Sequence, residues 1–341
     1  MGEVLARHTT LRLGGPAGHY LEATTEEELV DAVRVADQAG EPVLLVAGGS
    51  NLVVADEGFP GTVVKIATRG VVVDQDACSG ATVRVAAGEG WDTLVERAVD
   101  EGWVGVEALS GIPGSVGATP IQNVGAYGQE VSQTIASVRC WDRQQSAVRT
   151  LAAADCGFGY RTSRFKRDPG RFVVLSVTFQ LRLGDLGAPI GYAELARALG
   201  VEPGERVAMK RVREAVLDLR RGKGMVLDAE DHDTWSAGSF FTNPVLLPAE
   251  AARLPEGAPR WEQPDGRVKT SAAWLIDNAG FGKGYGNARV SLSTKHALAL
   301  TNRGGASTAD LVELAKEVRA GVEERFGVRL DNEPVMVGCA L

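Results

Sequence analysis

Glycine is unusually frequent in this sequence, at 42 of 341 residues, where about 7% is typical. The glycines cluster at 48–49, 111–128 and 280–286, between segments with regular hydrophobic patterns. Glycine permits positive φ and lets other groups approach the backbone closely. The stretch 103–130 is too rich in glycine for a long helix, and loops of this length inside a domain are usually functional. We therefore expect backbone loops that are pressed closely against another group.

The composition is that of an ordinary globular protein, with 44% hydrophobic and 23% charged residues. A chain of this length can form two or three domains. The net charge of −8 argues against nucleic acid or a membrane surface as a general partner. The N-terminal residues lack the apolar run of a signal peptide, and no stretch approaches about 18 apolar residues. We therefore expect a cytoplasmic protein without membrane insertion.

The cysteine and histidine residues form no recognisable ligand set. Cys78, Cys140, Cys156 and Cys339 are scattered without a CxxC pair, and the four histidines are dispersed. Metal and disulfide sites require closely spaced residues of these types. The sequence therefore predicts neither a metal site nor a disulfide framework.

Hydrophobic periodicity predicts alternating strands and helices along the chain. In the first region, Thr25 is a candidate helix N-cap, Glu28 completes a capping box, and Gly40 is a stop signal. Strands are expected at 19–24, 42–49, 62–66, 81–90, 135–142, 171–183 and 296–302, and a closing strand is expected at the end of the chain. Helices are expected at 25–40, 91–102, 205–221, 271–280 and 307–327. The charges of the 205–221 helix most simply form a solvated face, and contact with a ligand phosphate is the alternative.

These elements suggest three domains. The first spans 1–68, the second 69–222 and the third 223–327, and the C-terminal segment 328–341 returns to the first domain.

Two glycine loops are candidates for cofactor binding. AGGSNLVV (47–54) follows a buried strand and could form an anion-binding turn. It matches neither GxGxxG nor GxxxxGK[ST], and a simple tight turn is the alternative. The loop at 111–128 could wrap a pyrophosphate and an isoalloxazine edge through main-chain groups. Together the two loops suggest one extended cofactor that bridges two small α+β domains.

Three distant segments carry candidate reactive groups. Ser239 lies between a glycine and two phenylalanines in SAGSFFTNP (236–244), and could donate a proton in a dry site or be an ordinary core serine. Arg161 could belong to a surface basic loop, or could recognise a carboxylate or an enolate. Glu333, among apolar neighbours, is either salt-bridged for structure or a protonated general acid. Together they suggest an enzyme that protonates a carbanion.

Three other residues have simple structural readings when taken alone. His296 is most often read as a core histidine, Tyr192 as a packing residue, and Lys283 as an exposed residue of a glycine turn.

These segments together resemble the UDP-N-acetylenolpyruvoylglucosamine reductase family, in the subclass with a substrate-binding tyrosine loop. The matching stretches follow the family's order over essentially the whole chain: TLRLGG (10–15), AGGSNLVV, GIPGSVGATPIQNVGAYG (111–128), CGFGYRTSRFK (156–166), SAGSFFTNP, AAWLIDNAGFGKG (272–284) and LDNEPVMVG (330–338). The resemblance implies an α+β protein with a vanillyl-alcohol-oxidase-type FAD-binding fold of two small α+β domains, plus a third α+β domain that binds substrate.

The resemblance also implies a reaction and its participants. FAD is held tightly without a covalent bond, and NADPH and UDP-N-acetylglucosamine enolpyruvate bind in alternation. Hydride passes from flavin N5 to the enolpyruvyl β-carbon, which forms UDP-N-acetylmuramate for peptidoglycan synthesis. By the resemblance, Arg161 and Glu333 stabilise the resulting negative charge, and Ser239 donates a proton to the α-carbon. The family leans to monomers.

Further residues match binding positions of the family. The implied cofactor contacts are Gly48, Gly49, Ser50, Asn51, Leu52, Gly111, Pro113, Gly114, Ser115, Gly117, Ala118, Asn123, Gly125, Ala126 and Tyr127. The implied substrate contacts are Tyr160, Tyr192, Asn243, Lys283 and His296. His232 is the nearest counterpart of a pyrophosphate-binding lysine, and two departures from the family pattern are Ala47 and Pro334, which follows the proposed acid directly.

Two other functions remain open at this point. The first is another FAD enzyme of the same fold that oxidises an alcohol or hydroxy acid, although no His or Cys for a covalent flavin link occurs in 47–54 or 111–128. The second is a non-catalytic protein that binds a nucleotide sugar, which would need neither a flavin nor Ser239.

Overall fold

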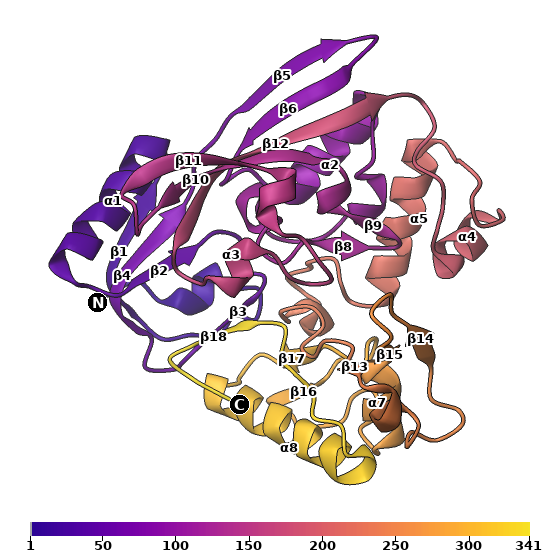
Figure 1. The fold of residues 1–341 in the computed structure, drawn as a ribbon. Helices are drawn as coiled ribbons and strands as arrows, with labels where there is room; N and C mark the ends of the chain where they lie inside the picture. The colour runs from indigo at the N-terminus through magenta and orange to yellow at the C-terminus, as the bar shows by residue number, and fades with distance from the viewer. Residues whose placement is uncertain (1) are drawn as a thin grey trace. The chain divides into compact units, whose positions relative to one another are not determined.

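Helices and strands are mixed along the whole chain in the computed structural model, which describes residues 2–341 (Figure 1). The chain forms two compact units, and each is described by itself. The larger unit comprises residues 18–48 and 60–222, and the smaller unit comprises residues 1–17, 49–59 and 223–341. Both units contain helices and strands, as expected for an α+β protein. The three-domain division with boundaries at 68, 222 and 327 stays a prediction.

The larger unit contains two sheets and five helices among the described residues. Its strands are β1 (Ala17–Ala23), β2 (Val43–Val46), β4 (Phe59–Ile66), β5 (Val71–Asp76), β6 (Gly80–Ala86), β7 (Trp103–Val104), β10 (Ile135–Asp142), β11 (Ala147–Ala152) and β12 (Phe172–Leu183), with β8 (Gly125–Ala126) and β9 (Gln129–Glu130) as a separate pair. Its helices are α1 (Glu26–Ala39), α2 (Trp91–Asp100), α3 (Arg164–Arg167), α4 (Ala193–Leu199) and α5 (Met209–Gly222).

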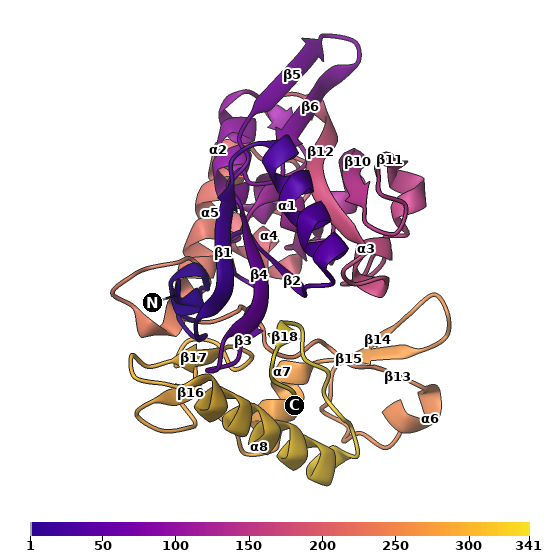
Figure 2. The same cartoon turned by 90° about the vertical axis from the view of Figure 1, so that its left-hand side faces the viewer.

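The first sheet of the larger unit has the order β1-β4-β2, and β2 runs parallel to β4. Helix α1 lies against it (Figure 2), with Leu29 and Val33 fully buried in the shared core. The predicted capping box of Thr25 and Glu28 is confirmed, and Gly40 ends the helix in the left-handed conformation. These caps satisfy backbone groups that a helix leaves without partners at its ends.

The second sheet has the order β11-β10-β12-β6-β5, and its neighbouring strands are antiparallel. The long strand β12 lies in the middle and also pairs with β7. Helix α2 buries Trp91 in the core beneath the sheet, and the Trp91 indole donates a hydrogen bond to the Leu109 carbonyl at 3.0 Å. This bond fixes the chain just before the second glycine loop.

The smaller unit is built from short strands and three helices among the described residues. Its strands are β3 (Leu52–Val54), β13 (Val245–Leu246), β14 (Arg260–Glu262), β15 (Val268–Thr270), β16 (Val290–Leu292), β17 (Leu300–Asn302) and β18 (Val335–Val337). Its helices are α6 (Pro248–Ala251), α7 (Ala272–Asn278) and α8 (Thr308–Phe326).

The core of the smaller unit lies under α8, which packs against β16 and β17 (Figures 1 and 2). Ser307 caps α8 in a capping box with Asp310. The closing strand β18 pairs in parallel with β3. The C-terminal segment therefore returns to a strand near the start of the chain.

Several predicted elements are shorter than expected, and two of them have a clear structural cause. The predicted strand 296–302 is limited to β17, because the Ser293 hydroxyl accepts hydrogen bonds from the N–H groups of Lys295 and His296 and forms a turn there. The helix predicted at 205–221 begins at Met209, since the preceding Val207 and Ala208 pair with the 186–187 segment. Among residues 2–341, no helix is long and apolar enough to span a membrane.

Candidate active site

Ser239 is not a core serine. Its side chain is half-buried, whereas Phe240 and Phe241 are each only 1% exposed and belong to the core of the smaller unit. The two phenyl rings pack edge to face with centroids 5.2 Å apart. The phenylalanines therefore anchor the segment in the core, while the serine remains at its edge.

The backbone of Phe240 joins three segments that are distant in sequence. Its N–H donates to the Leu298 carbonyl at 2.7 Å, and its carbonyl accepts from the Glu333 N–H at 2.8 Å. Phe241 and Asn332 form an adjacent bridge. The backbones of the Ser239 segment, the 293–299 loop and the Glu333 segment are thus neighbours, and the pairing of Ser239 with Glu333 in the reaction stays a prediction.

His296 brings an imidazole to Ser239. Its Nε2 lies 3.5 Å from the Ser239 Oγ, and both side chains are half-buried. The reading of His296 as an enclosed core histidine therefore does not describe its position. The imidazole is placed to interact with the serine hydroxyl.

Asp233 fixes the loop that carries His296. Its carboxylate accepts hydrogen bonds from the Thr294 N–H at 2.9 Å, from the Thr294 hydroxyl, and from Arg303 at 2.9 Å. Burial alone would raise the pKa of Asp233, but the hydrogen bonds from Thr294 and Ser293 and the charge of Arg303 hold it below its ordinary value. The carboxylate is therefore ionised at neutral pH.

The first glycine loop continues to Glu333. The Asn51 side-chain amide donates to the Glu333 carbonyl at 3.4 Å, and the Asn51 carbonyl accepts from the Val335 N–H at 2.9 Å. Gly49 has a φ of +59°, and a Cβ there would lie 1.8 Å from the His8 carbonyl oxygen. Only glycine fits this position. The Glu333 and Val335 N–H groups hold the segment, so Pro334 between them leaves those bonds intact.

In the larger unit, the two glycine loops touch. A Cβ on Gly48 would lie 2.5 Å from the Gly114 Cα, so the absence of both side chains permits the contact. Gly117 is needed for packing, because a Cβ there would meet the Ala87 Cβ at 2.5 Å. The Gly117 N–H donates a hydrogen bond to the Ala87 carbonyl, so this group takes part in the fold.

Ser115, in the second glycine loop, points to a missing ligand. Its side chain is 5% exposed, and within residues 2–341 its hydroxyl has no hydrogen-bond partner. A buried hydroxyl without a partner costs about 1–3 kcal/mol. A cofactor oxygen beside this loop would supply the partner, so the residues present fit a bound dinucleotide.

An ion pair holds the start of the second glycine loop. The Asp92 carboxylate accepts from the Gly111 N–H at 2.5 Å and from two Arg213 nitrogens at 2.7 and 3.0 Å. Burial alone would raise the pKa of Asp92, but these bonds hold it below its ordinary value. Arg213 lies on α5, so one side of this helix is not the solvated face that the sequence suggested.

We expect Asp92→Asn to weaken binding of the expected FAD cofactor by about 10- to 100-fold, since hydrogen bonds to charged groups contribute about 1.5–3 kcal/mol. Fluorescence titration of the apoprotein with FAD measures this affinity. Asp100→Asn on the same helix is the control, because its ion pair with Lys210 is exposed. The contribution of Asp92 is complete above the ordinary carboxyl pKa and is lost as the pH falls through the lowered value. Equal affinities of Asp92→Asn and wild type would show that Asp92 does not order the loop.

Arg161 lies in the larger unit, in a strained backbone conformation. Its φ is +51°, and Asn123 and Tyr127 also have positive φ, at +49° and +48°. Such angles are uncommon outside glycine and occur often at functional sites. The Arg161 guanidinium donates to the Gly125 carbonyl at 2.9 Å, and the Asn123 amide donates to the Gly159 carbonyl at 3.1 Å. The predicted arginine segment therefore packs on the end of the second glycine loop.

Two predicted tyrosines also meet in the larger unit. Tyr192, 46% exposed, packs edge to face with Tyr127 at 5.7 Å between ring centroids. Burial raises the pKa of Tyr127 to about 12, so it remains protonated. Tyr160 is 44% exposed. Exposed aromatic rings of this kind are available to a ligand.

Other predicted substrate residues lie in the smaller unit. The Asn243 side-chain oxygen accepts from the Ala272 N–H at 3.0 Å at the start of α7, so part of its amide is used in the fold. Lys283 is exposed in a glycine turn. The His232 ring packs on Trp235, with centroids 4.2 Å apart.

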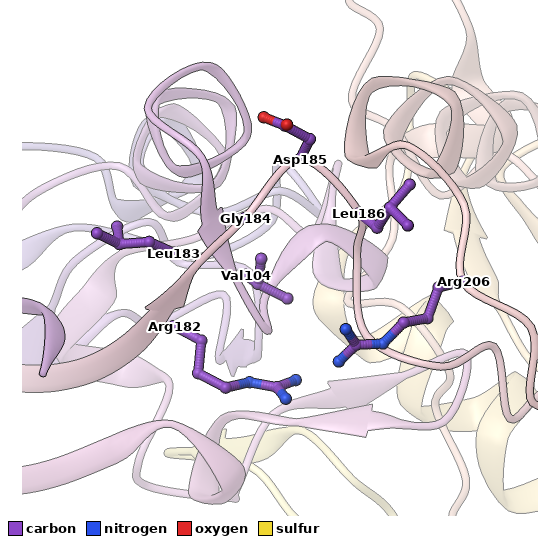
Figure 3. Close-up of a pocket in the computed structure, with 7 residues that line it drawn as sticks. All are labelled: Val104, Arg182, Leu183, Gly184, Asp185, Leu186 and Arg206. Carbon is purple, nitrogen blue, oxygen red and sulfur yellow. The ribbon is translucent and has the colours of Figure 1, made fainter. Parts of the chain in front are cut away.

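A separate hollow of about 240 Å³ opens at the end of β12. Arg182 and Arg206 reach into it from two sides, while the Asp185 side chain points away (Figure 3). None of the predicted site residues lines it. The candidate residues of the smaller unit thus lie in the segments around Phe240 and at 49–52, and those of the larger unit lie in the second glycine loop and around Arg161.

Sequence reasoning missed Asp92, Asp233 and the role of the 293–299 loop. Asp92 stands in the first turn of a helix, where an acidic residue is common for local reasons. Asp233 stands in EDHDTW, where several acidic residues give no reason to single one out. Both act on segments far along the chain, so no local spacing marks them.

Comparisons with known proteins agree with this geometry. Residues 17–151 match the model of an FAD binding domain, and residues 230–337 match the C-terminal domain of UDP-N-acetylenolpyruvoylglucosamine reductase. The chain is 58% identical to the enzyme of that name from Cutibacterium acnes over 340 residues, and 59% identical to that from Streptomyces coelicolor over 348. Each alignment covers 99% of this chain and 90% of the relative.

A solved structure also matches over the full length. It is the UDP-N-acetylenolpyruvylglucosamine reductase of Thermus caldophilus, with 26% identity and a TM-score of 0.67. The match covers 98% of this chain and 97% of that one.

Proposed function

Because the chain belongs to the UDP-N-acetylenolpyruvoylglucosamine reductase family, we propose that it reduces UDP-N-acetylglucosamine enolpyruvate to UDP-N-acetylmuramate with NADPH, in peptidoglycan synthesis. It has the vanillyl-alcohol-oxidase-type FAD-binding fold of α+β class. The observation that most supports this function is the backbone of Phe240, which holds Ser239 beside Glu333 and His296.

FAD is the cofactor, and when bound it supplies the hydride for the substrate double bond. The glycine loops of the larger unit fit it through Gly48, Gly111, Gly114 and the buried Ser115 hydroxyl. We assign the remaining cofactor contacts of the sequence prediction to the same loops and to the 49–52 segment. Their proposed role is to bind and orient the cofactor without a covalent bond.

Ser239 is the proposed proton donor to the substrate α-carbon. Hydride addition to the β-carbon leaves negative charge at the α-carbon and its carboxylate. Glu333, held by Phe240 and Asn51, would stabilise this charge in its protonated form through a donated hydrogen bond. Arg161, in the larger unit, would stabilise the same negative charge through its guanidinium. This role rests on the resemblance of its segment, in sequence order, to the family.

The substrate contacts stay part of the proposal. Tyr160 and Tyr192 present exposed rings, and Lys283 presents an exposed ammonium that suits a phosphate. Asn243 and His296 are half-buried in the smaller unit. We further infer a cytoplasmic monomer; size-exclusion chromatography with light scattering tests the oligomeric state.

Anaerobic half-reactions test the proposed function. NADPH should bleach the visible absorption of the bound FAD, and UDP-N-acetylglucosamine enolpyruvate should then restore it with formation of UDP-N-acetylmuramate. A protein without bound flavin would be a simple nucleotide-sugar binder. Reoxidation by an alcohol-derived ketone, but not by the enolpyruvyl sugar, would place it among other FAD oxidoreductases of the same fold.

A further inference from the structure

The proposed role of Ser239 poses a physical problem. A serine hydroxyl is a very weak acid, and donating its proton leaves an alkoxide, which is a strong base. A half-buried alkoxide is costly unless a neighbouring group neutralises it as it forms. A second proton donor within reach of the Ser239 oxygen would prevent this charge from accumulating.

His296 is placed to be that donor. Its Nε2 lies 3.5 Å from the Ser239 Oγ, within a small adjustment of hydrogen-bond distance, and such contacts commonly shorten when substrate is bound. The two residues are held in register by the backbone bond from Phe240 N–H to the Leu298 carbonyl at 2.7 Å, two residues beyond the histidine. A main-chain hydrogen bond therefore keeps the Ser239 and His296 segments close together.

Hydrogen bonds fix the 293–299 loop, which carries His296. The Ser293 hydroxyl, fully buried, accepts the N–H groups of Lys295 and His296 at 3.1 and 3.2 Å. The Ala299 N–H donates to the His296 carbonyl at 3.2 Å. Asp233 bonds Thr294 and Arg303. Several hydrogen bonds therefore hold the backbone of the loop that carries the His296 imidazole.

Charged groups lie near the 293–299 loop on the segments that contact it. On the 228–238 segment, Asp231 pairs with Lys295 at 2.5 Å and Asp233 pairs with Arg303 at 2.9 Å. On the C-terminal segment, Glu333 bonds to Phe240, next to Ser239. His296 is half-exposed, so its imidazole can exchange protons with water. Imidazole also has an ordinary pKa of about 6.5, which suits proton exchange near neutral pH.

We propose that His296 is a proton-relay residue that acts through Ser239. As the Ser239 O–H bond breaks and the proton passes to the substrate α-carbon, the His296 imidazolium transfers its Nε2 proton to the Ser239 oxygen. Serine is thereby regenerated, neutral imidazole remains, and water returns the proton to the imidazole. One proton is taken from solvent per turnover, and no free alkoxide accumulates. This inference rests on the proposed function.

His296→Gln tests the relay, because glutamine keeps hydrogen-bonding groups at this position but cannot titrate. Reduction of the bound FAD by NADPH should match wild type, and reoxidation by UDP-N-acetylglucosamine enolpyruvate should slow by about 100-fold, at the lower end of what a positioned acid–base group contributes. Added imidazole should restore part of the rate. His19→Gln, an exposed change on β1, is the control and should behave as wild type.

The pH profile and solvent isotope effect distinguish a relay from a structural role. In wild type, reoxidation should slow as the pH rises through the imidazolium pKa, and His296→Gln should lose this step. Rates in mixtures of H₂O and D₂O should show two protons in flight for wild type and one for His296→Gln.

NMR gives a readout independent of turnover. The chain has four histidines, so the His296 imidazole can be assigned, and Ser239→Ala should shift its titration. The relay is overturned if wild type turns over the enolpyruvyl sugar while His296→Gln matches its rate, pH profile and isotope effect. If wild type itself fails to turn it over, the proposed function fails instead.

Discussion

Ser239→Ala should leave reduction of the bound FAD by NADPH unchanged and slow its reoxidation by UDP-N-acetylglucosamine enolpyruvate by about 10³- to 10⁴-fold. The reason is that a positioned acid contributes up to about 10⁴-fold to proton transfer, and alanine removes the hydroxyl of the residue that precedes Phe240, whose backbone bonds Glu333. Anaerobic stopped-flow absorbance measures both half-reactions on one sample. The effect should appear in the second half-reaction alone.

Two further variants separate chemistry from damage to the segment. Ser239→Cys keeps an acidic proton at the same position and should retain more of the reoxidation rate than Ser239→Ala. Ser236→Ala lies three residues away, where the hydroxyl accepts a hydrogen bond from the Gly238 N–H at 3.2 Å, and this variant should be reoxidised at close to the wild-type rate. Reoxidation of Ser239→Ala at the wild-type rate would remove Ser239 from the chemistry.

Much of the fold could be predicted because its signals are local. Thr25 with Glu28 and Ser307 with Asp310 place helix starts within a few residues, since a cap and its partner lie in the same turn. The strand expected at 135–142 matches β10 in full. Glycine was also informative, because the contact of Gly48 with Gly114 requires the absence of both side chains.

The arrangement of the site could be predicted only through the family's chain order. Phe240 is joined to Leu298 and Glu333 by main-chain groups, and every residue type except proline carries the same groups. Asp92 bonds an arginine 121 residues away. Such contacts depend on how the chain folds back on itself, which spacing along the sequence does not encode.

The structure also changes the reading of the phenylalanines. The sequence suggested that Ser239, beside Phe240 and Phe241, could donate a proton in a dry site. Instead, both rings are fully enclosed in the core of the smaller unit, and Ser239 lies half-buried at its edge. Their main physical contribution is to fix the backbone that carries the serine, and this makes the segment sensitive to core mutations.

Phe240→Ala should therefore lower the free energy of unfolding of the smaller unit by about 3–5 kcal/mol, the usual cost of removing a buried phenylalanine ring. The alanine loses the packing with Phe241 and leaves a cavity beneath the junction, while the backbone groups of residue 240 remain. Because the Phe240 and Glu333 amides donate the two junction bonds, hydrogen exchange at residues 240 and 333 should accelerate by about 10²- to 10⁴-fold, since 1.4 kcal/mol corresponds to tenfold. Phe240→Leu, which fills most of the space, should cost less than about 1.5 kcal/mol and leave both amides protected. If Phe240→Ala unfolds at the wild-type urea concentration with unchanged exchange at both amides, the junction does not depend on core packing, and the position of Ser239 must be fixed by other contacts.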